Sequence, residues 1–163
     1  MAKLRYKNVC VLIVTLLMVL GIAAPAIASD EPPASVAGQV VFAVGDAYVV
    51  GLSGPQKATA GSIVLAGDRL VTGVNGYVHL RMADGAFLGV RSDSLIEINE
   101  YMFDITKPEN GRVRLFLKEG TVRAISGRIA QENKQNFRLN TPLAAIGIRG
   151  TDFVAAADQG STQ

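Results

Sequence analysis

The sequence predicts an all-β protein with many short strands, arranged as a β-sandwich or an irregular β-helix-like stack and preceded by a signal-peptide helix. From Gly38 onward, short runs rich in Val, Ile and Leu alternate with Gly, Asp and Asn about every ten residues. No stretch shows the period of a long amphipathic helix. The segment 126–136 is polar enough for a loop or for one helical turn only.

The first 28 residues have the pattern of an export signal. Three cations, Lys3, Arg5 and Lys7, precede an apolar run, and Ala26 and Ala28 form a small-residue cleavage site. The alternative is an uncleaved anchor, since the apolar run approaches the roughly 20 residues that span a membrane. We therefore expect export to the periplasm or cell envelope of a Gram-negative-type bacterium, with membrane attachment only if the segment stays uncleaved.

The remaining chain is expected to hold a flexible leader at 29–37 and one domain at 38–163. The signal segment carries three of the sixteen basic residues and none of the fourteen acidic ones, so 13 basic and 14 acidic residues remain, with a net charge of −1. This balance predicts no binding of nucleic acid. The only cysteine, Cys10, leaves with the signal, so the domain forms no disulfide and depends on burial for its stability.

The clearest hairpin covers 78–91. Its apolar residues alternate and can share one face: Val78, Leu80, Met82, Leu88 and Val90. Asp84 and Gly85 between them are expected to supply the positive φ angles of a tight turn.

Asn110 and Gly111 are expected to play the same part between strands at 103–106 and 113–117. The segment 112–118 alternates charged and apolar residues except at Phe116, so one of its faces is expected to meet water.

No metal or cofactor is expected. His79, the only histidine, lies on the polar side of its strand, so a zinc or copper site lacks its usual ligands. A calcium site of carboxylates near Asp84 or Asp93 stays open, although no loop has the spacing of a calcium motif.

The sequence also argues against an enzyme. It contains no Gly-x-Ser-x-Gly element, and the glycines and the lysine of 54–61 do not follow the order of a phosphate loop. Glu97 and Glu100 could form a glycosidase pair, but solvated strand carboxylates are the commoner explanation of such residues.

The end of the chain carries its most specific motif: Thr141 and Pro142, an apolar strand, and the corner Arg149-Gly150-Thr151-Asp152-Phe153. This order resembles the FecR domain family. Further matching segments follow in order at 38–40, 45–49, 66–73, 88–98 and 115–122. The resemblance covers residues 38 to about 154, and it implies an all-β periplasmic or envelope domain.

Two differences from the family's founding members bear on function. Those members are implied to relay a signal from an outer-membrane transporter to a cytoplasmic sigma factor, which needs an N-terminal cytoplasmic domain. Only residues 1–8 precede the apolar run here, so the chain resembles the free-standing exported members. It also ends ten residues after Phe153, so C-terminal strands of the domain are expected to be missing and a strand edge to be left for another chain.

Two functional classes remain open. The first is a non-catalytic sensing, regulatory or scaffolding module that binds another envelope protein, or a second copy of itself, through a strand edge or sheet face. The second is a glycan or peptidoglycan binder. That function needs an aromatic platform, for which the sequence offers no Trp and only Tyr48, Tyr77 and Tyr101 after the signal.

The corner at 149–151 can be structural or part of a binding site. Gly150 permits a conformation closed to other residues, Arg149 can pair with Asp152, and Thr151 can bond back to the chain. A structural corner explains all three, so we expect the substitution Gly150→Val to unfold the domain, as measured by circular dichroism. Wild-type stability combined with loss of partner binding would instead identify the corner as recognition surface.

Overall fold

The computed structural model describes residues 35–147 and 151–158. The predicted signal-peptide helix, with its cleavage residues Ala26 and Ala28, lies outside the described residues. The strands are β1 (Val36–Val44), β2 (Ala47–Gly51), β3 (Gly54–Lys57), β4 (Ile63–Leu65), β5 (Arg69–Thr72), β6 (Tyr77–Met82), β7 (Phe87–Val90), β8 (Ser94–Met102), β9 (Arg112–Ile125), β10 (Phe137–Asn140), β11 (Ala145–Gly147) and β12 (Asp152–Ala157). The helical elements are the 3-10 helices η1 (Pro108–Asn110) and η2 (Lys134–Asn136) and the short helix α2 (Arg128–Glu132).

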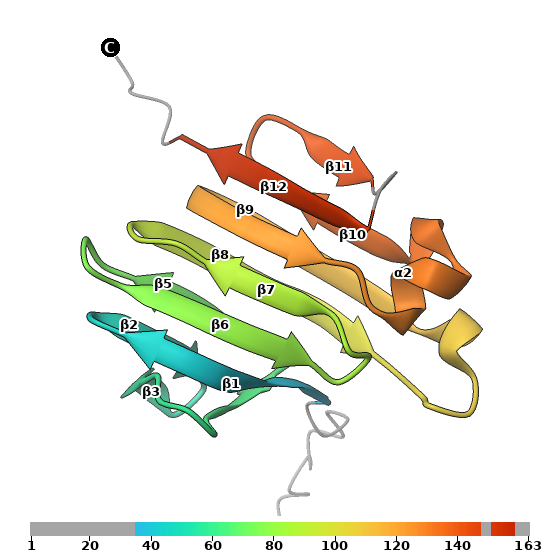
Figure 1. The fold of residues 1–163 in the computed structure, drawn as a ribbon, viewed down its shortest axis with the longest axis horizontal. Helices are drawn as coiled ribbons and strands as arrows, with labels where there is room; N and C mark the ends of the chain where they lie inside the picture. Colours follow the sequence, from blue (N-terminus) through green and yellow to red (C-terminus); the bar gives the residue numbers. More distant parts are fainter. Residues whose placement is uncertain (1–34, 148–150, 159–163) are drawn as a thin grey trace, which may run out of the picture. The chain divides into compact units, whose positions relative to one another are not determined.

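The strands form one curled sheet that folds over into two layers (Figure 1). We call sheet A the layer with strand order β4-β1-β6-β7-β9-β12, and sheet B the layer with strand order β3-β2-β5-β8-β9-β10-β11. Every pairing is antiparallel except that of β10 with β9. The all-β prediction is confirmed, and the two layers correspond to the sandwich rather than to the stack.

The long strand β9 belongs to both sheets. Its first half pairs with β8 and β10, and its second half pairs with β7 and β12. Gly120 lies between the halves with a φ of +86°, and a Cβ there would lie 2.1 Å from Ser94 Oγ and 2.4 Å from the Asp93 carbonyl oxygen. The sequence pattern predicts a strand end at this glycine, but the strand bends there and continues.

The core lies between the two layers. The inward residues of both sheets form one hydrophobic cluster, and its largest fully buried members are Tyr101, Leu70, Leu80, Leu88, Ile96, Ile98, Leu115, Leu117, Ile129 and Leu139. Full burial of one such side chain stabilises the fold by about 1.5–3 kcal/mol. The alternation in β9 that predicted one wet face is confirmed, because Val113, Leu115 and Leu117 are buried while Arg112 and Lys118 are exposed.

The predicted hairpin at 78–91 is formed by β6 and β7, with Val78 opposite Val90 and Leu80 opposite Leu88. Gly85 takes a φ of +85°, and its N–H donates to the Met82 carbonyl oxygen at 3.0 Å. The expectation that Asp84 also has a positive φ is wrong. A three-residue connection of this kind needs the left-handed conformation only at its last residue.

Asn110 and Gly111 do not form the expected tight turn. β8 ends at Met102, so 103–106 is not a strand, and Asn110 ends the 3-10 helix η1. Gly111 has a φ of −62°. A glycine fits here because a Cβ would lie 2.6 Å from Ile129 Cγ1.

The first strand of the domain begins close to its expected position. β1 begins at Val36, two residues before the expected start at Gly38, and Ala37 is fully buried. The segment 126–136, expected to be a loop or one helical turn, instead forms two short helical elements, α2 and η2. No helix among the described residues is long and apolar enough to cross a membrane.

The bend in β9 generates a stability prediction. We expect Gly120→Ala to lower the free energy of unfolding by roughly 3 kcal/mol, because strain at positive φ adds to a steric clash with the backbone at Asp93. Gly85→Ala is the matched control, since it has the same strain but open space around the new Cβ, and about 1 kcal/mol is expected. Urea unfolding of both variants measures the difference, and equal losses would show that the bend does not depend on close packing.

Candidate interaction surface

The predicted motif residues Thr141 and Pro142 form a turn between β10 and β11. The Thr141 N–H donates to the Ala144 carbonyl oxygen at 2.7 Å, and the Ala144 N–H donates to Thr141 Oγ1 at 3.1 Å. Both bonds close the turn locally. Thr141 therefore has a structural role, as its short loop requires.

The described part of the corner, from Thr151 to Phe153, leads into β12 of sheet A. Arg149 and Gly150 lie outside the described residues. The Thr151 carbonyl oxygen accepts a hydrogen bond from the Ser126 N–H at 2.7 Å, and the Phe153 ring packs edge-on against Phe137 with centroids 6.1 Å apart. Phe153 thus joins β12 of sheet A to β10 of sheet B.

Among the described residues, Asp152 is paired with Arg123, whereas Arg149, the partner suggested from the sequence, lies outside them. Its carboxylate accepts two hydrogen bonds from Arg123, at 3.0 Å from Nε and 2.5 Å from Nη2. These bonds fix β12 to its neighbour β9, and they hold the pKa of the Asp152 carboxyl below its usual range.

Asp84 is more than a turn residue, because its carboxylate is buried. Oδ1 accepts hydrogen bonds from the Tyr101 hydroxyl at 3.1 Å and the Ala86 N–H at 3.2 Å, and Oδ2 accepts one from the Ile129 N–H at 3.3 Å. The Tyr101 hydroxyl also accepts from the Asp84 N–H at 2.8 Å, and burial raises the pKa of Tyr101. The network joins the β6–β7 turn to β8 and α2, and it leaves the carboxylate no access to a substrate.

The outer side of sheet A carries a group of rings that we call the aromatic face: Phe42, Tyr77, His79 and Phe87. The rings of Phe42 and Tyr77 lie 6.4 Å apart, and those of His79 and Phe87 lie 5.3 Å apart. Phe42 is opposite His79 in register, so the two ring pairs adjoin. His79 therefore lies on the outer side of its strand, where the sequence placed it.

The row of residues that passes through the aromatic face runs across five strands of sheet A, from β1 to β12. The register aligns Phe42 on β1 with His79, Gly89, Arg123 and finally Val154 on β12. Half of Phe42 and 59% of Val154 remain exposed. Large apolar side chains gathered on the outer side of a sheet are typical of a surface that another molecule covers.

The edge strand β12 borders this face. Within the described part of the chain it pairs only with β9. Thr151 is hydrogen-bonded to Ser126, and hydrogen-bonded pairs alternate along an antiparallel ladder. The N–H and C=O groups of Asp152, Val154 and Ala156 therefore point away from β9. Of the other edges, β3 contains Pro55 and β4 has only three residues, two features that discourage strand pairing.

Glu97 and Glu100, the carboxylates considered as an acid pair, take part in surface ion pairs. Glu97 pairs with Lys118 at 2.9 Å, and Glu100 pairs with Arg112 at 3.3 Å, so both act as surface ion-pair partners. In residues 35–147 and 151–158 no group of three or more His, Cys, Asp and Glu side chains could hold a metal ion.

Comparison with known proteins identifies a family for the chain. A family model described as FecR protein matches residues 68–163, more than half of the chain. A search of the curated proteins and of the solved structures finds no significant match.

The chain therefore belongs to the FecR family. This family is known for regulatory and sensing domains of the periplasm, and it is not in general a family of enzymes. The match includes the Arg-Gly-Thr-x-Phe corner but begins at Asp68, after the segments at 38–40 and 45–49 that also resemble the family.

The sequence did not reveal the aromatic face. Tyr77 and His79 were visible as alternate residues of one strand, but the positions of Phe42 and Phe87 depend on strand register. Of the tyrosines considered for a sugar platform, Tyr101 is buried, and Tyr48 lies on sheet B.

The ion pair between Arg123 and Asp152 gives a titration prediction. We expect the folded-state pKa of Asp152 to lie below the unfolded value of about 3.9 and to return toward it in Arg123→Gln. Because this pKa is lowered by folding, the stabilisation from the pair is present above the unfolded pKa and is lost as pH falls through the folded one. Carbon-13 NMR of the carboxyl group measures both values, and an unchanged pKa in the variant would contradict the pairing.

Proposed function

We propose that the chain is a non-catalytic sensing, regulatory or scaffolding module of the periplasm or cell envelope that binds another envelope protein. The observation that carries this proposal is the aromatic face of sheet A, with Phe42 half exposed and its register row running across five strands to the exposed Val154. Its composition supports a protein partner, since aromatic residues and arginine are enriched where proteins meet. Membership of a family of regulatory periplasmic domains supports the same role.

Partner binding through this face would combine two kinds of contact. Side chains of the partner would cover Phe42 and its neighbouring rings, while Arg81, whose guanidinium lies 6.0 Å from the centre of the Phe87 ring, would supply hydrogen bonds at the rim. An extended segment of the partner, or β12 of a second copy, could also pair with the free edge of β12. Val154 contributes to both contacts, because its side chain lies on the same outer side of sheet A as the rings and its backbone groups point away from β9.

Binding of a glycan is the second candidate. Two observations favour it. The rings of Phe42 and Tyr77 adjoin each other. The Tyr77 hydroxyl lies against Gly89, where a Cβ would come within 2.9 Å of it. Rings on a flat surface can stack against the apolar face of a sugar.

The proposal is tested by photo-crosslinking in cells with a photoreactive residue at position 154. We expect a discrete crosslink to another protein that falls about fivefold or more in Phe42→Gln, because that substitution removes an exposed ring from the contact. Leu52→Gln is the matched control, since Leu52 is fully exposed on the β2–β3 turn of sheet B and its replacement should leave the crosslink unchanged. Thermal melts of both variants establish that they fold.

A crosslink that does not depend on Phe42 would contradict docking on the aromatic face. Sedimentation of the protein with purified cell wall separates the two candidates. Retention by wall alone that is lost in Phe42→Gln would favour the glycan, and absence of retention together with the crosslink favours the protein partner.

A further inference from the structure

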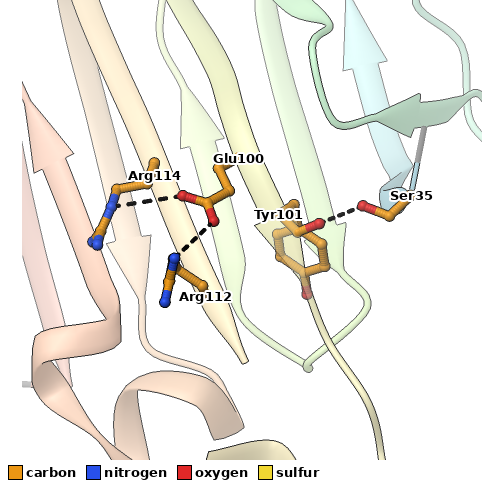
Figure 2. Close-up of polar contacts among 5 residues, drawn as sticks. All are labelled: Ser35, Glu100, Tyr101, Arg112 and Arg114. Carbon is orange, nitrogen blue, oxygen red and sulfur yellow. Dashed lines mark hydrogen bonds and ion pairs between the residues drawn. The ribbon is translucent and has the colours of Figure 1, made fainter. Parts of the chain in front are cut away.

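A second surface lies on the outer side of sheet B, where two arginines pair with one carboxylate and a third arginine lies on the next strand. Glu100 on β8 pairs with Arg112 at 3.3 Å and with Arg114 at 3.8 Å, both on β9 (Figure 2). Arg138 on β10 is aligned with Arg114 in the parallel register. We call Arg112, Arg114 and Arg138 the arginine cluster.

Arg114 is poorly satisfied by Glu100. Its Nε lies 3.8 Å from Glu100 Oε2, beyond hydrogen-bond distance, and its Nη1 is buried without a hydrogen-bond partner in the described part of the chain. Arg123 on sheet A, in contrast, donates two hydrogen bonds to Asp152. Arg114 therefore keeps donor capacity that its own neighbours leave unused.

Arg138 places a second guanidinium group beside that of Arg114. Among residues 35–147 and 151–158, no carboxylate forms an ion pair with Arg138. Neighbouring strands are roughly 4.8 Å apart, so the aligned Arg114 and Arg138 repel each other across the ladder. An anion placed between them would relieve that repulsion and occupy both guanidinium groups.

Space for such an anion lies next to Arg138. A hollow of about 300 Å³ is lined by Lys134, Gln135, Phe137, Arg138, Ala145, Ile146 and Gly147, with no acidic residue among them. Gly147 is opposite Arg138 in register, and a Cβ there would meet nothing within 4 Å. The hollow therefore opens beside the Arg138 side chain and carries two cations.

We propose that the arginine cluster and this hollow bind an extended acidic peptide segment of a partner protein. Arginine recognises carboxylates through paired hydrogen bonds, and the cluster carries three cations against the single carboxylate of Glu100. This site lies on sheet B and does not depend on docking to the aromatic face. The whole chain without its signal has a net charge of −1, so general attraction between the protein and an acidic peptide does not explain binding.

The spacing favours an extended peptide over a membrane surface. Arg112 and Arg114 are two residues apart on one strand, about 6.7 Å, which matches alternate side chains of another extended chain. A flat anionic membrane would instead meet Glu97 and Glu100 together with the arginines.

Fluorescence anisotropy of a labelled peptide of about eight residues, alternating Glu with Thr, tests the proposal with the full chain at an ionic strength of about 0.05 M. We expect saturable binding that weakens about fivefold to tenfold in Arg138→Gln, because a charge-assisted bond is lost. Arg138 is exposed, so the variant should fold normally, and a thermal melt verifies this. Arg91→Gln is the matched control, with the same charge change at another exposed arginine, and less than about a twofold change is expected.

Three results would overturn the proposal. The first is an equal loss in Arg91→Gln and Arg138→Gln, which would mean unspecific attraction of charge. The second is equally strong binding of the same peptide with Gln in place of Glu. The third is binding to vesicles of anionic phospholipid, or to inorganic phosphate, that depends on Arg138 while the acidic peptide does not bind.

Discussion

The whole fold depends on one strand that serves two sheets. β9 gives its first half to sheet B and its second half to sheet A, so both layers are bonded to the same backbone. The residue at the bend needs a positive φ and has no room for a side chain, because the chain at Ser94 lies against it. Gly120 meets both conditions. Ser94 in turn accepts a hydrogen bond from the Thr121 N–H at 2.9 Å, which fixes the corner from the other side.

Hydrogen bonds between buried polar groups fix the relative positions of a turn, a strand and a helix that hydrophobic burial alone does not specify. The carboxylate of Asp84 ties the β6–β7 turn to Tyr101 and to α2, and Gly127 lets α2 approach, since a Cβ there would lie 2.4 Å from Asp84 Oδ2. A buried carboxylate is costly without partners, but this one accepts three hydrogen bonds. Such a network favours a single arrangement of turn, strand and helix, because the carboxylate keeps all its partners only when the three are in place together.

Local patterns were enough to predict the all-β class, the β6–β7 hairpin and the wet face of β9, because alternation with period two and a glycine turn act over a few residues. They could not predict how distant segments meet. Gly120 has the same signature as a turn glycine, and only its contact with Ser94, far away in sequence, makes it a bend. The partners of Asp84 lie 17 and 45 residues away, so its local surroundings showed only a turn.

The shared strand has a consequence for how the domain could hold two molecules at once. The aromatic face and the arginine cluster lie on opposite outer sides of two layers whose backbones are roughly 10 Å apart. Because β9 runs through both layers, the sheets cannot slide past each other without breaking its ladder bonds. Molecules docked on the two sides would be kept at a constant separation and orientation, so the domain would serve as a rigid spacer between them.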